Sequence, residues 1–175
     1  MSNIGFVGLG IMGKPMALNL IKGGHTLFLN SRSGVPKELT DAGGTSCASP
    51  KEVAQKADII ITMVPDTPDV EKVMFGENGI ASGLSKGKIV VDMSSISPIA
   101  TKEFAQKINA LGCDYLDAPV SGGQLGAKGA TLTIMVGGSE VTFQTVKPVF
   151  ELMGKNITLV GGNGAGQITK VANQI

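Results

Sequence analysis

Short runs of β-branched and apolar residues alternate with helical patterns along nearly the whole chain. The apolar runs cover residues 4–7, 26–29, 59–63, 89–92, 115–116, 132–136 and 157–160. Between them, helical segments are predicted over residues 12–22, 35–42, 50–56, 67–75, 98–110 and 139–152. Strands that alternate with helices imply βαβ crossovers. The pattern therefore predicts an α/β fold with a doubly wound, mostly parallel sheet of the Rossmann type.

Three of the expected helices have a clear start signal. Ser49, Thr67 and Ser97 each stand directly before a proline. A hydroxyl side chain can accept a hydrogen bond from a free N–H group of the first turn, and proline suits the first helical position. We therefore expect these three residues to be helix N-caps.

Two segments depart from the alternation. Residues 117–131 are rich in glycine and predict a long loop, which in a compact domain is more often functional than idle. Residues 161–166 predict a turn, after which an amphipathic helix begins at Gln167 and continues without a glycine cap or polar tail. We expect residues 1–163 to form one dinucleotide-binding domain, and residues 164–175 to begin a helix that leads to a further domain.

Composition narrows the possible partners. With 175 residues, of which 42% are hydrophobic and 17% charged, the chain can bury the core of one good domain. A net charge of +1 gives no electrostatic basis for a nucleic-acid or membrane partner, and the apolar runs are too short to span a bilayer. Because the first predicted strand begins at once, we expect no signal peptide. Cys47, Cys113 and the single histidine, His25, have no metal-binding spacing, so we expect a cytoplasmic protein without a metal site.

A glycine pattern follows the first apolar run directly. Gly8, Gly10 and Gly13 form the motif G-x-G-x-x-G, which is weak by itself in a chain with 25 glycines. Its place between a strand and a helix makes it specific: the glycines allow a tight turn, a close backbone approach to a pyrophosphate and close helix packing. We expect a dinucleotide to bind along this turn, at Gly8, Leu9, Gly10, Ile11, Met12 and Gly13.

The end of the second predicted strand bears on the choice of cofactor. About 20 residues after the glycines, an acidic residue would bind a free ribose 2′-hydroxyl. The chain has Asn30, Ser31 and Arg32 there instead, and an arginine can bind a 2′-phosphate through charge-assisted hydrogen bonds. The sequence thus favours NADP(H), with NAD(H) possible and a solvated surface arginine as the alternative reading of Arg32.

Further cofactor contacts are expected where other strands end, because ligands of open α/β sheets lie beyond the carboxyl ends of the strands. Val64 and Pro65 follow one such strand and could form a wall of the cofactor site. Ser95 follows another and could hydrogen-bond near the nicotinamide. Each of these residues, taken alone, could equally belong to an ordinary loop.

Lys170 is the most distinctive single residue near the end of the chain. We place it on the first turn of the terminal helix, with Asn173 three residues later on the same face. A lysine shielded from water gives up its proton readily and can serve in acid–base chemistry. An exposed helical lysine without a role is the alternative that spacing alone leaves open.

With these residues in view, the chain resembles the β-hydroxyacid dehydrogenase family, which includes 3-hydroxyisobutyrate dehydrogenase. The resemblance covers essentially the whole chain. It is carried by four motifs in order, at residues 5–16, 92–98, 117–123 and 164–173.

The resemblance implies a role for several of these positions. Ser121, Gly122 and Gly123 match the loop that holds the substrate carboxylate with a hydroxyl and backbone N–H groups. Lys170 matches the catalytic lysine, and Asn173 matches an amide that positions the substrate. Ser95 stands where the family often has a threonine at the cofactor, and Gln174 replaces an asparagine common in relatives. The family also implies a second, all-helical domain and a homo-oligomer.

The implied activity is reduction of a small aldehyde that carries a carboxylate. The resemblance is strongest to members that use NADPH to reduce tartronate semialdehyde to glycerate, with Lys170 as general acid and base. Alternatives are 3-hydroxyisobutyrate or a related semialdehyde, which residues 124–131 would decide, and a non-catalytic NADP-binding module. A 6-phosphogluconate dehydrogenase is disfavoured because its relatives have histidine where Asn173 stands.

Overall fold

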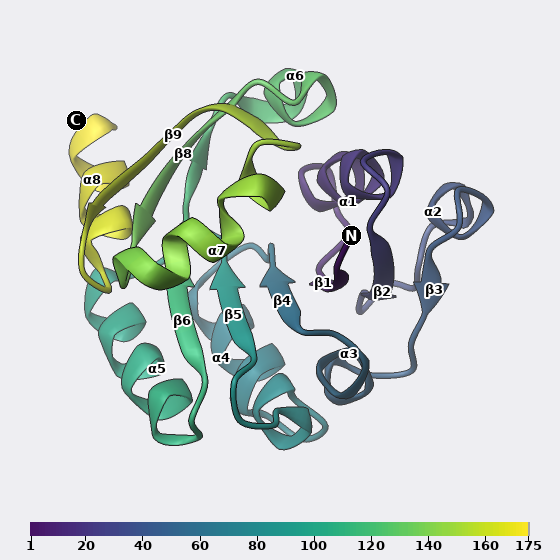
Figure 1. Ribbon diagram of the computed structural model, residues 1–175, viewed down its shortest axis with the longest axis horizontal. Coiled ribbons are helices and arrows are strands. Elements are labelled where there is room, and N and C mark those ends of the chain that lie inside the picture. Colours follow the sequence, from purple (N-terminus) through teal and green to yellow (C-terminus); the bar gives the residue numbers. More distant parts are fainter. Residues whose placement is uncertain (175) are drawn as a thin grey trace.

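Nine strands form one mixed sheet in the computed structural model, which describes residues 1–174. Figure 1 shows their arrangement. The strands are β1 (Asn3–Val7), β2 (Thr26–Asn30), β3 (Thr45–Ser46), β4 (Ile59–Thr62), β5 (Ile89–Asp92), β6 (Asp114–Asp117), β7 (Val120–Ser121), β8 (Leu132–Gly137) and β9 (Gly154–Gly161).

The strand order matches the predicted fold. Neighbouring strands run β3-β2-β1-β4-β5-β6-β8-β7, and β9 pairs with β8. From β3 to β6 every pairing is parallel, while β8 is antiparallel to β6 and β7. The order reverses between β1 and β4, which is where a Rossmann sheet opens a crevice for its ligand. The expectation of a doubly wound, mostly parallel sheet is confirmed.

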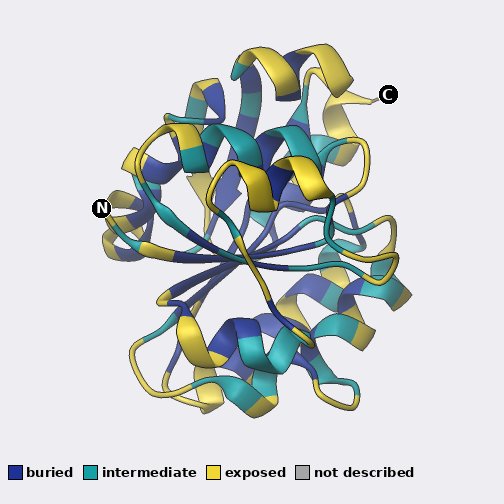
Figure 2. Ribbon diagram, turned by 90° about the vertical axis from the view of Figure 1, so that its right-hand side faces the viewer, coloured by how far each residue is buried: buried dark blue, intermediate teal, exposed yellow. Residues whose placement is uncertain are grey.

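Helices cover both faces of the sheet, as the edge-on view in Figure 2 shows. One buried cluster joins the sheet to α1 (Gly13–Lys22), α2 (Lys37–Asp41), α6 (Gly123–Gly129) and α7 (Glu140–Phe150). The other joins it to α3 (Pro50–Lys56), α4 (Thr67–Phe75), the 3-10 helix η1 (Ile80–Gly83) and α5 (Pro98–Ala110). The last helix, α8 (Ala165–Asn173), packs on β8 and β9. Within the described chain, no helix combines the length and apolar character needed to cross a lipid bilayer.

The central strands are apolar on both sides because both sides are covered. In β4, Ile59 and Ile61 belong to one buried cluster, and Ile60 belongs to the other. In β5, Val90 and Val91 divide between the clusters in the same way. Uninterrupted β-branched runs of this kind are typical of parallel strands buried between two helical layers.

Residues 117–131 are more ordered than predicted. They contain the short strand β7 and the seven-residue helix α6 rather than one long loop. Three of the seven α6 residues are glycines, and Leu125, its third residue, is 85% exposed. The helix therefore shows no apolar stripe by which sequence alone could reveal it.

Two of the three predicted N-caps are confirmed, and the third is wrong. The hydroxyls of Ser49 and Ser97 accept backbone hydrogen bonds at 3.2 and 3.3 Å at the starts of α3 and α5. Helix α4 is capped by Asp66, which forms a capping box with Asp69. Thr67 is instead the first helical residue, and its hydroxyl accepts a hydrogen bond from the backbone N–H of Ser97. An aspartate one residue earlier offered the stronger cap.

Candidate functional site

The glycine turn between β1 and α1 has two positions at which a side chain cannot fit. Gly8 has φ +102°, and a Cβ there would overlap the carbonyl oxygen of Met63. A Cβ on Gly13 would overlap the carbonyl oxygen of Gly8. Gly10 differs, since it is exposed and no atom lies within 4 Å of the place its Cβ would take. Gly8 and Gly13 thus allow the turn and its packing, while Gly10 leaves free space for a ligand.

The start of α1 is suited to an anion. Its N-cap, Met12, makes no side-chain hydrogen bond, and the first turn contains no acidic residue. The N–H group of Lys14 donates to the carbonyl oxygen of Gly10 at 3.0 Å, while the N–H groups of Met12 and Gly13 and the positive end of the helix dipole remain available. Leu9 is buried and anchors the turn, whereas Ile11 is 70% exposed beside it. These residues fit the pyrophosphate of a dinucleotide.

The end of β2 presents a cation. The amide of Asn30 donates to the carbonyl oxygen of Cys47 at 3.0 Å and so holds the segment after β3. Ser31 and Arg32 follow in a turn, and the Arg32 side chain is 83% exposed. One guanidinium nitrogen lies 4.0 Å from a carboxylate oxygen of Asp69 at the start of α4. Arg32 thus reaches from the loop after β2 toward the loop after β4.

The ends of β4 and β5 meet the glycine turn. The side chain of Val64 lies directly over Gly8, where an added Cβ would come within 2.9 Å of it. The backbone N–H of Val64 donates to the Ser94 hydroxyl at 2.9 Å. Pro65 and Ser95 are exposed on the loops that follow the two strands. The predicted cofactor residues therefore come from several loops at the carboxyl edge of the sheet.

The predicted catalytic lysine and the predicted substrate loop are brought together. The Lys170 ammonium group donates to the Ser121 hydroxyl at 2.9 Å, although the residues are 49 positions apart. Both side chains are half buried. Helix α8 begins at Ala165 rather than at Gln167, so Lys170 lies in the last turn of the described helix and not in the first.

The remaining predicted substrate residues lie next to this pair along the chain, after Ser121 or after Lys170. Gly122 and Gly123 are exposed and have φ values of +134° and +61°, which glycine adopts without strain. Asn173 is exposed, and its amide nitrogen lies 3.5 Å from the sulfur of Met135. Among the hydrogen bonds of the described residues, none joins Asn173 to Lys170 or Ser121.

Three buried polar residues of the site were missed in the sequence. The carboxylate of Asp117, at the end of β6, accepts hydrogen bonds from the backbone N–H groups of Gly164 and Gln167 at 2.8 and 3.1 Å. It thereby caps α8 from outside, and burial raises its pKa. Gln167 and Ser94 are also buried and hydrogen-bonded to each other. Two features of the sequence could have indicated them: Asp117 and Ser94 are polar residues at or just after a strand end, and Gln167 is a polar residue on the buried face of a helix.

Asp92, at the end of β5, lies buried next to this group. One carboxylate oxygen accepts hydrogen bonds from the Thr62 hydroxyl at 2.8 Å and the Ser94 N–H at 3.1 Å. The other oxygen and the nearby Tyr115 hydroxyl are buried without a protein partner. Burial raises the pKa of Asp92 to about 6.

Comparison with known proteins identifies the family of this domain. Residues 3–162 match the family model described as the NAD-binding domain of 6-phosphogluconate dehydrogenase. The chain is 60% identical over 172 residues to 2-hydroxy-3-oxopropionate reductase of Escherichia coli, covering 98% of the chain and 59% of that protein. It superposes on 3-hydroxyisobutyrate dehydrogenase of Mycobacterium tuberculosis, solved with L-serine, with a TM-score of 0.89 and 36% identity over 99% of the chain and 59% of that structure.

A further solved structure concerns the cofactor. Psf3, solved in complex with NADP+ and 2-OPP, gives a TM-score of 0.90 at 26% identity over 97% of the chain and 61% of that structure. The chain therefore spans about three-fifths of the length of the relatives it matches.

Proposed function

The chain belongs to the β-hydroxyacid dehydrogenase family through its NAD-binding domain, and from this premise we propose a specific reaction for it. The reaction is the NADPH-dependent reduction of tartronate semialdehyde (2-hydroxy-3-oxopropanoate) to glycerate. We assign this reaction to the full-length enzyme, meaning a protein of the relatives' length that contains this chain. We propose in addition that this enzyme is a homo-oligomer and that it is cytoplasmic. The two cysteines are free, as is usual in a reducing compartment.

The observation that carries the proposal is the hydrogen bond between Lys170 and Ser121. It joins a proton donor to the hydroxyl of a glycine-rich segment on the same sheet as the dinucleotide turn. A dinucleotide site without such a proton donor would support only a cofactor-binding module. The half-buried ammonium beside it supports chemistry on a bound carbonyl compound.

Held along the glycine turn at Gly8, Gly10 and Gly13, NADPH would supply the hydride that reduces the aldehyde carbon. Ser121 and the exposed backbone of Gly122 and Gly123 hold the substrate carboxylate and orient the aldehyde. The Lys170 ammonium hydrogen-bonds to the carbonyl oxygen and donates a proton as the alkoxide forms. In the oxidative direction the neutral amine takes that proton back. Asn173 lies three positions after Lys170 on α8, and we propose that it positions the substrate.

The preference for NADPH rests on Arg32. Its exposed guanidinium can bind a 2′-phosphate bidentately, and the end of β2 has Asn30 where an NAD site would carry an acid. Asp69 is the only ion-pair partner of Arg32 among the described residues, at the long distance of 4.0 Å. A 2′-phosphate can therefore compete for the guanidinium.

The substrate is tested by turnover of the full-length enzyme. NADPH oxidation is followed with tartronate semialdehyde, and 3-hydroxyisobutyrate is offered with NADP+ in the reverse direction. We expect a higher kcat/KM for tartronate semialdehyde. A preference for 3-hydroxyisobutyrate would replace the proposed substrate and keep the reaction type. Tight NADPH binding without turnover of either compound would contradict the proposal and favour a binding module.

A further inference from the structure

The helix that carries Lys170 is tied to the loop after β5 by one buried side chain. Gln167 is 1% exposed. Its amide nitrogen donates to the carbonyl oxygen of Ser94 at 2.7 Å, and its amide oxygen accepts from the N–H of Ile96 at 3.1 Å. These two backbone groups flank Ser95, the exposed residue proposed to lie at the nicotinamide. Gln167 thus holds the backbone on both sides of a cofactor residue.

The same side chain lies close to the catalytic lysine along the helix. Gln167 and Lys170 are three positions apart on α8, so they lie on neighbouring turns of one face. The start of α8 is held separately, because the Asp117 carboxylate accepts from the N–H groups of Gly164 and Gln167. Any rotation or shift of α8 that moved Lys170 would therefore break the amide contacts of Gln167.

The loop held by Gln167 also contacts the cofactor turn. The Ser94 hydroxyl accepts from the N–H of Val64, and Val64 packs over Gly8. A continuous path of short contacts thus runs from the glycine turn through Val64, Ser94 and Gln167 to the helix of Lys170. Each contact on this path involves groups that are at least partly buried.

We propose that Gln167 is a positioning residue that sets the Lys170 ammonium in register with the nicotinamide end of the cofactor, by holding the backbone on either side of Ser95. The inference rests on the proposed function, since it assigns Lys170 and Ser95 to one reaction. It adds a residue that does not touch substrate or cofactor and acts through the two groups that do.

An anchoring role for the helix alone would not require this chemistry. The start of α8 is already held by the Asp117 carboxylate, so the helix does not depend on a second polar contact for its position on the sheet. Gln167 instead uses both of its polar atoms, and it uses them on the two neighbours of one exposed residue. That arrangement specifies the position of the Ser95 loop relative to α8.

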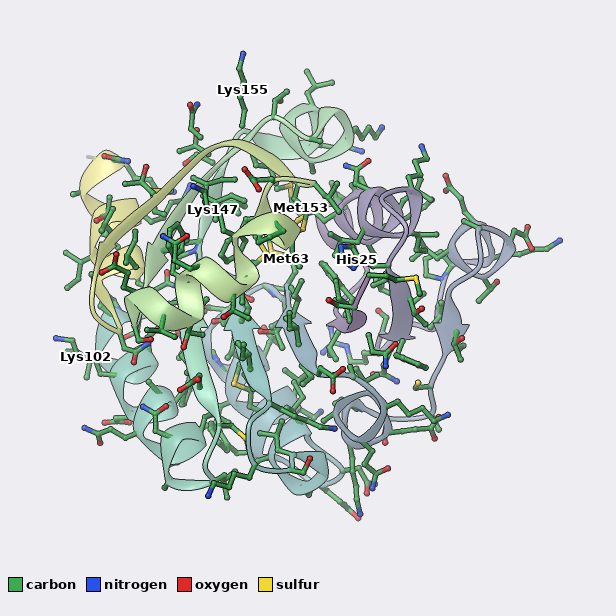
Figure 3. All side chains as sticks on the ribbon, in the orientation of Figure 1. His25, Met63, Lys102, Lys147, Met153 and Lys155 are labelled. Atoms are coloured by element: carbon green, nitrogen blue, oxygen red, sulfur yellow. The ribbon has the colours of Figure 1, made fainter. Side chains whose placement is uncertain are left out.

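The first test is Gln167→Met in the full-length enzyme, which keeps the volume and removes both hydrogen bonds. Because small displacements of reacting groups are costly, we expect kcat to fall roughly 10- to 100-fold. The Kd for NADPH changes little, and the isotope effect with NADPH deuterated at C4 increases because hydride transfer becomes slower. The matched control is Lys102→Met. Lys102 extends outward from α5 (Figure 3), and its side chain lies near Gly164 at the start of α8. Among the hydrogen bonds of the described residues, none joins Lys102 to the loop after β5.

The second test needs no turnover and uses the 175-residue chain. Amide hydrogen exchange is measured with and without NADPH. We expect NADPH to slow exchange at Lys170 and Val171 in the wild-type chain and in Lys102→Met, and to have no such effect in Gln167→Met. Protection confined to the cofactor loops in the wild type would overturn the inference, even if the enzyme proves inactive on tartronate semialdehyde.

The two proposals fail in different ways. A wild-type enzyme without turnover contradicts the proposed function and leaves the exchange experiment to decide the role of Gln167. An active wild type whose Gln167→Met variant keeps its kcat and isotope effect contradicts the positioning role alone. A Gln167→Met protein with fewer active sites but an unchanged isotope effect shows a purely structural role and also overturns the inference.

Discussion

The pairing of Lys170 with Ser121 depends on where two short elements end. Ser121 closes β7, which pairs with β8, and Lys170 lies on α8, which packs across β8. The hydroxyl orients the ammonium, and both remain half exposed toward the space where a substrate would lie. At the scale of single residues, the proposed site therefore consists of a proton donor, its orienting partner and, on the loop after β2, the cation Arg32.

Removing the Ser121 hydroxyl should weaken substrate recognition. A hydrogen bond to a charged group contributes roughly 1.5–3 kcal/mol, so Ser121→Ala should lower kcat/KM about 10- to 100-fold. The loss is expected in KM, because the hydroxyl is assigned to the substrate carboxylate, and also in kcat, because the same hydroxyl accepts from the Lys170 ammonium. The control is Thr133→Val at the cross-strand neighbour of Ser121. Steady-state kinetics of both variants checks this, and equal losses in the two would contradict the assignment.

Replacing Arg32 should separate the two cofactors. Arg32→Ala removes charge-assisted hydrogen bonds to a 2′-phosphate and should raise the Kd for NADPH roughly 10- to 100-fold, while the Kd for NADH changes little. Asp69→Asn removes the competing carboxylate and should leave NADPH binding as tight or tighter. Fluorescence titration of the chain with each cofactor measures these constants. Equal weakening of NADPH and NADH binding would refute the role of Arg32.

Burial of Asp92 should make stability depend on pH. Burial raises the pKa of this carboxyl from 3.8 to about 6, so the folded chain binds the proton more tightly than the unfolded chain. The contribution to stability is complete below about pH 4 and is lost as pH rises through 6, which corresponds to roughly 3 kcal/mol.

Asp92→Asn tests this effect, since an amide does not titrate and keeps an oxygen for Thr62 and Ser94. Relative to the wild type, the variant should gain stability between pH 4 and pH 7. Urea unfolding at several pH values gives the difference in free energy of unfolding. A difference that stays constant across this range would mean that Asp92 has an ordinary pKa.

At the scale of elements, the glycine turn combines folding and binding in one short segment. Gly8 and Gly13 are required because a side chain at either would meet a backbone carbonyl group. Gly10 has open space around it, and we propose that this space holds the cofactor. The three glycines of one motif therefore have separable effects on stability and on cofactor affinity.

Alanine substitutions should show this separation. Gly8→Ala forces a side chain into a left-handed conformation and a clash, and should destabilise the chain by about 1–3 kcal/mol or more. Gly10→Ala should leave the free energy of unfolding nearly unchanged and weaken NADPH binding, because the new methyl group occupies the pyrophosphate space. Thermal unfolding and cofactor titration of both variants distinguish the two effects. Unchanged NADPH affinity in Gly10→Ala would place the cofactor elsewhere.

Elements with a strong apolar period were predictable, and those without one were not. The parallel strands and α1, α5 and α7 follow from their patterns because each buries a continuous face. The short strand β3, with two exposed residues, and the glycine-rich α6 have no such face. The start of α8 was misplaced for a related reason: its N-cap residue is Gly164, and the N–H groups of its first turn are bound by the side chain of Asp117, which is distant in sequence.

At the scale of the whole molecule, the sheet order brings the separate motifs to one edge. The glycine turn, Arg32 and Lys170 could be nominated from local sequence and family resemblance. The 2.9 Å contact of Lys170 with Ser121 and the contacts of Gln167 could not, because they depend on how β7, α8 and the loop after β5 pack in space. Sequence therefore predicts which residues matter more readily than which residues act together.

Cofactor binding and proton donation are assigned to different parts of the chain, and Lys170→Ala tests this division most directly. NADPH affinity and the single-turnover rate with tartronate semialdehyde are measured on the same full-length variant. We predict wild-type affinity for NADPH together with a rate lowered by about 10²- to 10⁴-fold, the usual contribution of a general acid. A variant that loses NADPH binding, or one that keeps its rate, would contradict the claim.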